Sequence, residues 1–269
     1  MSNITIDPEK LELVSKLNLT DDVLFHKVAE DKDACEEMLQ IILQNPSLKI
    51  VSNQPQRFLR NIGNRSVILD LLCMDEQERY FHVEMQKKDD DDHQKRIRYN
   101  HSNIDTSFTE TGIKYKNLPD VCCIFISKFD VFHEGRTVYH VNRVIQETGT
   151  VVYNGFQEIY VNTTIDDGSE IAELMQYFKN STVTHKKFKH LSKRINYFKT
   201  VNEGVSEMCE LVEEYANKRA EQVKKETAEN LFHNGVSIEI VTKSIPDLPP
   251  EEIMEIYEEV MKEKNGTLV

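Results

Sequence analysis

Three polar residues occupy positions of a β-hairpin pattern at which apolar side chains are expected. The stretch from Leu69 to Gln86, LDLLCMDEQERYFHVEMQ, alternates like two half-buried strands around a polar turn, and it carries Asp70, Glu84 and Gln86 in those positions. Because side chains alternate across a strand, Glu84 and Gln86 share one face with His82. The hairpin therefore gathers two carboxylates and an amide.

This set of side chains is suited to holding a cation beside a phosphate. A turn from Asp75 to Glu78 would place Asp70 directly opposite Glu84, where two carboxylates repel by roughly a fraction of a kcal/mol, and by more when they are shielded from water. Mg²⁺ would offset this repulsion, since it takes one or two carboxylates together with water and substrate phosphate. Gln86 adds an amide that can hydrogen-bond a water or a phosphate oxygen but carries no charge. From spacing alone, a hairpin whose polar face meets solvent is the alternative.

Other elements must hold this hairpin in place. Apolar residues at helical spacing predict two short helices between residues 21 and 44, and the hairpin strands are expected at 66–74 and 79–87. A helix is predicted over 94–112, and strands over 121–129, 137–145 and 156–164 would extend the sheet. A short helix begins after Ser169. We expect residues 1–20 to form a poorly ordered lead-in and residues 21–183 to form the core.

The remaining chain, residues 184–269, is predicted to be helical. Its long charged stretch over 203–230 could pack as an arm or pair with another chain, which leaves a homodimer through these helices as an open expectation. The tail breaks at Asn234-Gly235 and again at 246–250, which gives short helical pieces that match a helix-turn-helix unit in outline only. Because the tail is acidic, a packing role is favoured over DNA binding.

The charge distribution suggests local rather than general affinity for phosphates. The formal net charge of −13 argues against a protein that coats nucleic acid by bulk electrostatics. Two basic groups stand out nonetheless, and they would fit a phosphate backbone if they are not simply solvated helix faces. The first contains Lys87, Lys88, Lys95, Arg96 and Arg98, and the second contains Lys186, Lys187, Lys189, Lys193, Arg194 and Lys199.

Composition limits the other classes of function. The 269 residues suffice for a sizeable core, and no run approaches the roughly 20 apolar residues that span a bilayer, so we expect a cytoplasmic protein without a membrane segment. The cysteines, Cys35, Cys73, Cys122, Cys123 and Cys209, are odd in number, lie within apolar patterns and lack CxxC spacing. We expect buried thiols rather than disulfides or a zinc site.

The order of elements, together with Asp70, Glu84 and Gln86, resembles the PD-(D/E)XK nuclease superfamily, and specifically the PD-(D/E)XK nuclease family transposases related to the recombination-promoting nucleases. The resemblance runs from about residue 20 to residue 260. It is carried by DDVLFHKVAEDKDACEEMLQIIL, SVILDLLCMDEQERYFHVEMQ, RIRYNHSNIDTSFTETGIKYKNLPDVCCIFISKFDVF, GFQEIYVNTT and NLFHNGVSIEIVTKSI.

The resemblance implies an α/β fold with a restriction-endonuclease-like mixed sheet flanked by helices, a helical C-terminal extension, and Mg²⁺- or Mn²⁺-dependent hydrolysis of DNA phosphodiesters. By position, Asp70 and Glu84 would hold the metal. Gln86 stands where the superfamily usually has a Lys, and it can orient a water but cannot neutralise charge. Lys87 points to the other strand face, so Arg96 or Arg98 would have to reach in from the next helix.

The resemblance also implies further site residues. A carboxylate from the first helical region is expected, with Glu37 preferred over Asp22 and Glu36, and Tyr99 and Asp105 could line the site or serve packing. DNA would be held by Lys87, Lys88, Arg96, Arg98, Lys186, Lys187, Lys189, Lys193 and Arg194, with salt-sensitive and mainly sequence-independent binding. Because of Gln86 and the acidic net charge, the alternatives are a catalytically silent relative that binds DNA or protein, and a regulatory partner that binds through its C-terminal helices.

Overall fold

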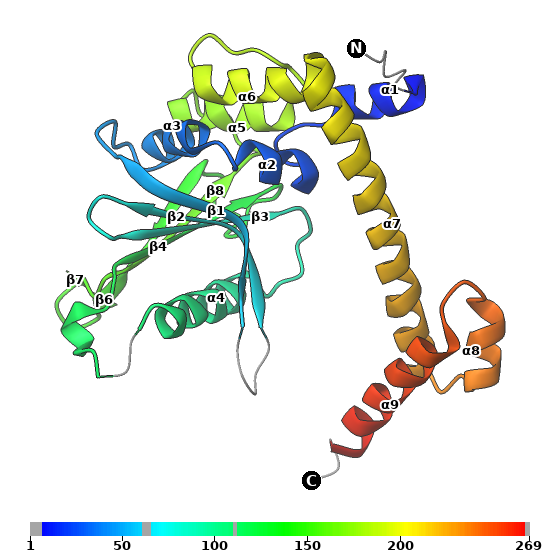
Figure 1. Ribbon diagram of the computed structural model, residues 1–269. Coiled ribbons are helices and arrows are strands. Elements are labelled where there is room, and N and C mark those ends of the chain that lie inside the picture. Colours follow the sequence, from blue (N-terminus) through cyan, green and yellow to red (C-terminus); the bar gives the residue numbers. More distant parts are fainter. Residues whose placement is uncertain (1–6, 61–65, 110–111, 267–269) are drawn as a thin grey trace. The chain divides into compact units, whose positions relative to one another are not determined.

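The computed structural model describes residues 7–60, 66–109 and 112–266, which fall into two compact units, 1–208 and 209–269. The elements of the first unit (Figure 1) are α1 (Pro8–Lys16), α2 (Asp22–Val28), α3 (Lys32–Ile42), β1 (Ile50–Leu59), β2 (Val67–Asp75), β3 (Tyr80–Gln86), α4 (His93–Ser107), a 3₁₀ turn (Tyr115–Asn117), β4 (Val121–Ser127), β5 (Val138–Val141), β6 (Arg143–Ile145), β7 (Thr150–Val152), β8 (Phe156–Asn162), α5 (Glu170–Lys179) and α6 (Lys189–Thr200). Helix α7 (Asn202–His233) continues into the second unit, which also contains α8 (Ile238–Ser244) and α9 (Pro250–Gly266).

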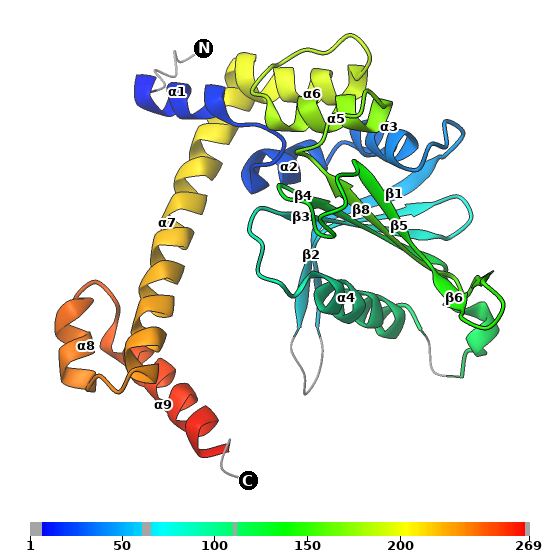
Figure 2. The same ribbon diagram turned by 180° about the vertical axis from the view of Figure 1, so that it is seen from behind.

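A mixed six-stranded sheet forms the centre of the first unit. Its strand order is β1-β2-β3-β4-β8-β5, in which β3, β4 and β8 run parallel and the other neighbours run antiparallel. Helix α4 covers one face, while α2, α3, α5 and α6 lie on the other (Figures 1 and 2). Strands β6 and β7 pair as a separate ribbon. The predicted α/β fold with a mixed sheet, flanking helices and a helical C-terminal part is confirmed.

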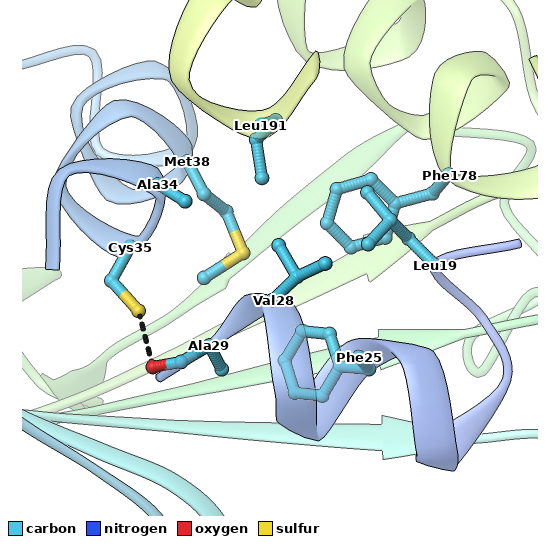
Figure 3. A pocket seen from close by; sticks show the side chains of 9 residues that line it. All are labelled: Leu19, Phe25, Val28, Ala29, Ala34, Cys35, Met38, Phe178 and Leu191. Atoms are coloured by element: carbon cyan, nitrogen blue, oxygen red, sulfur yellow. Dashed lines mark hydrogen bonds between the residues drawn. The ribbon is translucent and has the colours of Figure 1, made fainter. Parts of the chain in front are cut away.

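Apolar side chains fill both faces of the sheet. Under α4, the core contains Leu69, Phe125 and Tyr160, each at most 1% exposed. On the opposite face, apolar side chains from α2, α3, α5 and α6 surround a void of about 10 Å³, which is smaller than a ligand needs (Figure 3). Cys35 lines this void and donates its thiol to the Ala29 carbonyl at 3.2 Å. All five cysteines are buried, as expected.

Several elements differ from the sequence-based prediction. Residues 50–59 form the edge strand β1, which the sequence pattern does not reveal because polar residues and Pro55 interrupt the alternation. The strand expected over 137–145 is divided between β5 and β6, and residues 150–152 add β7. The expected lead-in contains α1, in which Asp7 caps the first turn and Val14 is buried.

The second unit has its own small helical core, made by side chains of α7, α8 and α9 and the turn between the last two. It contains Ala228, Phe232, Val241, Ile245, Leu248, Ile253 and Val260. The compact units divide at Met208, and α6 packs on α3 within the first unit. The domain boundary predicted at residue 183, where the sequence becomes helical, stays a prediction.

Candidate active site at the central hairpin

The β2–β3 hairpin is shaped by a buried carboxylate in its turn. Asp75 is 2% exposed, and its Oδ1 accepts hydrogen bonds from the backbone N–H groups of Gln77 and Arg79, both at 2.9 Å. The Arg79 guanidinium donates to Asp75 Oδ2 at 2.6 Å through Nη2 and at 2.8 Å through Nε. These bonds close the turn. The geometry of the closed turn then sets the register in which β3 pairs with β2.

The register places Asp70 at the point where the two strands separate. Leu72 pairs with His82 and Leu71 with Val83, which is the predicted register, and the ladder ends there. One residue further on, Asp70 Oδ2 accepts the backbone N–H of Met85 at 2.8 Å. Asp70 Oδ1 faces His26 Nε2 of α2 at 3.6 Å. The Asp70 carboxylate therefore sits in the fork between β2 and β3.

Glu84 lies on β3 at the same fork and is buried. Its Oε2 contacts His82 Nε2 at 3.2 Å, and its Oε1 lies 4.0 Å from Arg96 Nη1. Burial raises the pKa of Glu84, and the negative charge of Asp70 raises it further, while His82 and Arg96 oppose the shift. The charge of Asp70 thus acts on Glu84, but the ladder ends at Leu71 and Val83, so the direct cross-strand pairing of Asp70 with Glu84 that the sequence predicts is not part of the register.

Gln86 and Arg96 are joined next to Glu84. Arg96 Nη1 donates to Gln86 Oε1 at 3.3 Å, while Gln86 Nε2 donates to the Lys88 carbonyl at 3.0 Å. Arg96 also lies 3.5 Å from Asp92 and 3.9 Å from Asp90. The loop between β3 and α4 therefore holds the guanidinium over the end of β3.

The donor set fits a hard divalent cation. Asp70 and Glu84 supply carboxylate oxygens, and their mutual repulsion together with the buried position of Glu84 is what a bound cation would relieve. Among the residues that the structure describes, no three His, Cys, Asp or Glu side chains converge on one point. Two carboxylates are enough for Mg²⁺, which keeps several waters and takes substrate phosphate as a ligand.

A cleft of about 740 Å³ opens beside Glu84. Its lining residues come from the start of β2, from β3, and from α4 and the residue before it. It is lined by Ser66, Val67, Ile68, Glu84, Asp92, Lys95, Arg96, Arg98, Tyr99, Asn100 and Ser102. Basic side chains thus share one cavity with a candidate metal ligand.

Only some residues of the first basic group line this cleft. Arg96 and Arg98 line it, as does Lys95, and Lys88 is exposed on the adjoining loop. Lys87 turns the other way and lies 3.2 Å from Asp22 and 3.8 Å from Asp21. A role for Lys87 in DNA binding stays a prediction, and its charge is engaged by these acids.

The second basic group lies on the opposite face of the sheet. Lys186, Lys187, Lys189, Lys193 and Arg194 belong to α6 and the segment before it, whereas α4 lies across the sheet (Figures 1 and 2). Lys187 pairs with Glu173, and Arg194 pairs with Glu30 at 3.5 Å and covers the Phe198 ring. The structure does not bring the two basic groups together on one surface.

Glu37 lies on α3 and does not line the cleft beside Glu84. Its Oε2 accepts the Leu191 backbone N–H at 2.9 Å, so it caps the N-terminus of α6. The pocket beside it is lined by residues of α3 and by Lys49 and His190, and by no hairpin residue. The sequence-based choice of Glu37 for the site is not supported by this placement. Of the two alternatives, Glu36 bonds the Ile50 N–H at 2.9 Å, while Asp22 contacts Lys87 next to Gln86.

The structure adds site residues that sequence reasoning missed. His26 and His82 contact Asp70 and Glu84 respectively, and neither has a metal-ligand spacing that could reveal it. The alternation of β3 puts His82 on the same strand face as Glu84, and this shared face is the feature of the sequence that could have indicated their contact. Tyr99 lines the cleft, whereas Asp105 lies 3.4 Å from His101.

Comparison with known families agrees with the hairpin motif. The sequence model of the PD-(D/E)XK nuclease family transposases matches residues 22–231, which is most of the chain. The match covers α2, the sheet, α4 and the helices up to Leu231, and so includes Asp70, Glu84 and Gln86. No significant match to a curated protein or to a solved structure was found.

Proposed function

The chain belongs to the PD-(D/E)XK nuclease family transposases, and we propose that it is a divalent-metal-dependent DNA endonuclease that hydrolyses phosphodiester bonds in the cleft beside Glu84. The observation that supports this most strongly is the pair of carboxylates at the fork of the hairpin. Glu84 lines the cleft together with basic side chains of α4, and the negative charge of Asp70 acts on Glu84 from the fork.

In this proposal Asp70 and Glu84 would hold Mg²⁺ or Mn²⁺. When bound, such an ion lowers the pKa of a water ligand and stabilises negative charge on phosphate oxygens. The protein's own contribution begins with His82, whose ring nitrogen lies 3.2 Å from Glu84 Oε2 and fixes the carboxylate's orientation. The Met85 backbone N–H fixes Asp70 in the same way.

Arg96 takes over the charge that the usual Lys would supply. Gln86 can orient a water or a phosphate oxygen, but it cannot neutralise the charge that develops in the transition state. The Arg96 guanidinium lies 3.3 Å from Gln86 Oε1 and 4.0 Å from Glu84 Oε1, so a full positive charge stands next to both. Lys95 and Arg98, exposed on the same helix, would hold the flanking phosphates.

A catalytically silent relative that binds DNA or protein is the second candidate. It is favoured by the replacement of Lys by Gln86 and by the acids Asp90 and Asp92, which already engage Arg96. The two candidates differ in ion affinity, because a silent form has no need to bind metal at Asp70 and Glu84.

Nicking of supercoiled plasmid tests the proposed activity. Wild-type protein at low salt with Mg²⁺ or Mn²⁺ should convert the plasmid to open circles, and EDTA, Asp70→Ala and Glu84→Ala should each abolish conversion. Glu76→Ala is the matched control, since Glu76 is an exposed acid in the turn of the same hairpin. Metal-independent nicking, or nicking that survives both substitutions, would reject the proposal.

Assembly and location belong to the proposal as well. We propose that the chain forms a homodimer through its C-terminal helices. Light scattering of the full chain and of residues 1–208 can test this assembly. None of the helices in the described part of the chain combines the length and the apolar character of a membrane-spanning segment. A cytoplasmic location stays a prediction.

A further inference from the structure

Two large apolar side chains stand exposed beside the candidate active site. Phe58 on β1 is 55% exposed and Ile68 on β2 is 62% exposed. They are direct partners in the β1–β2 register, so they form one cross-strand pair. Single exposed apolar residues are common on proteins, but an adjacent aromatic and aliphatic pair, of which Ile68 lines the cleft, needs an explanation.

The hairpin geometry explains why these two side chains are left uncovered. The β1–β2 ladder continues to Leu59 and Val67, whereas the β2–β3 ladder stops at Leu71. Beyond that point β1 and β2 form a two-stranded extension. One face of the extension turns Leu59 and Leu69 into the core under α4, and the alternate face carries Phe58 and Ile68.

The exposed pair is continuous with the candidate metal ligands. Ile68 lies two residues before Asp70 on β2. Ile68 also lines the 740 Å³ cleft together with Glu84 and Arg98. Lys95 and Arg96 line the same cleft as Ile68. An apolar surface bordered by basic residues, next to a phosphate-cleaving site, matches the chemistry of DNA, in which bases stack on apolar side chains while phosphates meet Lys and Arg.

We propose that Phe58 and Ile68 contact the bases adjoining the scissile phosphate, and that the preferred substrate is duplex DNA containing an unpaired or weakly stacked base step. This inference rests on the proposed nuclease function. Apolar wedges that enter a base step must unstack it, and the cost of unstacking is lowest where a mismatch has already weakened stacking. A protein that inserts such a pair therefore gains most on mismatched or bulged DNA.

Cleavage of matched and mismatched oligonucleotide duplexes gives the first test. Wild-type protein should cleave a duplex with a central mismatch or single-base bulge about 5-fold or more faster than the paired duplex, because a base that stacks on an aromatic side chain stabilises the bound complex. The double variant Phe58→Ala/Ile68→Ala should bring this rate ratio towards one. The single variant Phe58→Tyr, which keeps the aromatic ring, should leave the ratio close to that of the wild type. Val51→Ala is the matched control, because Val51 is an exposed apolar residue elsewhere on β1.

Binding without cleavage gives the second test and separates the inference from the proposed function. Asp70→Asn protein, in EDTA, is titrated into duplexes that carry 2-aminopurine at the mismatch. A rise in fluorescence with Asp70→Asn protein that is lost in the triple variant Asp70→Asn/Phe58→Ala/Ile68→Ala supports base contact, even if no variant ever cleaves DNA. An equal rise with and without the pair, or no preference for mismatched DNA in either assay, would overturn the inference. A changed oligomeric state of Phe58→Ala/Ile68→Ala in light scattering would also overturn it, because the pair would then be a protein interface.

Discussion

Arg96 on α4 donates to Gln86 on β3, with Nη1 3.3 Å from Oε1. The amide that replaces the usual Lys of this superfamily is thus joined to a cation from the next helix. The same guanidinium lies near Glu84, Asp90 and Asp92, so its position is set by four acceptors. This relationship gives the site a positive charge without a Lys on the strand.

Arg96→Ala should lower the cleavage rate by about 100-fold or more, because a charged group aimed at a developing negative charge contributes on that scale. Arg96→Lys should recover part of the rate, since an ammonium keeps the charge but loses the forked geometry. Single-turnover rates at saturating DNA measure this effect. Lys95→Ala is the control, and it should weaken salt-sensitive binding while leaving the saturated rate close to that of the wild type.

Glu84→Gln should raise the thermal stability of the metal-free protein while abolishing cleavage. The pKa of Glu84 is raised above 4.5 in the folded state, chiefly by burial, so the ionised carboxylate disfavours folding. This destabilisation is absent below pH 4.5. It grows as the pH rises from 4.5 to the raised pKa of the folded state, and it is constant at higher pH. Melting in EDTA between pH 4 and 8 should therefore show a Tm gain that appears only at the higher pH values.

A Tm for Glu84→Gln that stays below that of the wild type at pH 8 would contradict this account. It would mean that the contacts of the carboxylate with His82 and Arg96 outweigh its burial. A Glu76→Ala melt provides the baseline, since Glu76 is exposed in the same hairpin.

Glu37→Ala should destabilise the fold and leave the cleavage rate of the folded protein unchanged. Removing its carboxylate leaves the Leu191 N–H at the start of α6 without this partner, at a cost of about 1 kcal/mol in the free energy of unfolding. Urea denaturation checks the loss. Glu37→Gln keeps an acceptor oxygen and should cost less, whereas a selective loss of cleavage in Glu37→Gln would return Glu37 to the active site.

Asp75→Ala should lower the free energy of unfolding by about 3 kcal/mol, because it removes a buried carboxylate that holds two backbone N–H groups and the Arg79 guanidinium. Chemical denaturation of Asp75→Ala beside Glu76→Ala measures this difference. A loss below about 0.5 kcal/mol would show that the turn does not depend on these bonds.

The hairpin could be predicted from the sequence because its information is local. The alternation of β2 and β3 and the polar turn at Asp75 fix the register, and the register alone brings Asp70 to the fork beside Glu84. Family resemblance then supplies the chemistry. Strand periodicity and the turn thus place both residues at the same end of the hairpin, although the ladder ends before Asp70.

The neighbours of the hairpin could not be predicted in the same way, because they come from tertiary packing. His26 reaches Asp70 from α2, and the partner that Glu37 finds on α6 is 154 positions away. Both basic groups look alike in sequence, yet the sheet separates them. The edge strand β1 gives no periodic signal because polar residues and Pro55 fill its middle.

Calorimetric titration of Mn²⁺ into the protein tests the central claim most directly, since the account stands on one cation site made by Asp70 and Glu84. We predict binding of a single ion to wild-type protein and to Glu76→Ala, and its loss in both Asp70→Asn and Glu84→Gln. Ion binding that persists in both site variants, or no binding to the folded wild-type protein, would contradict the account.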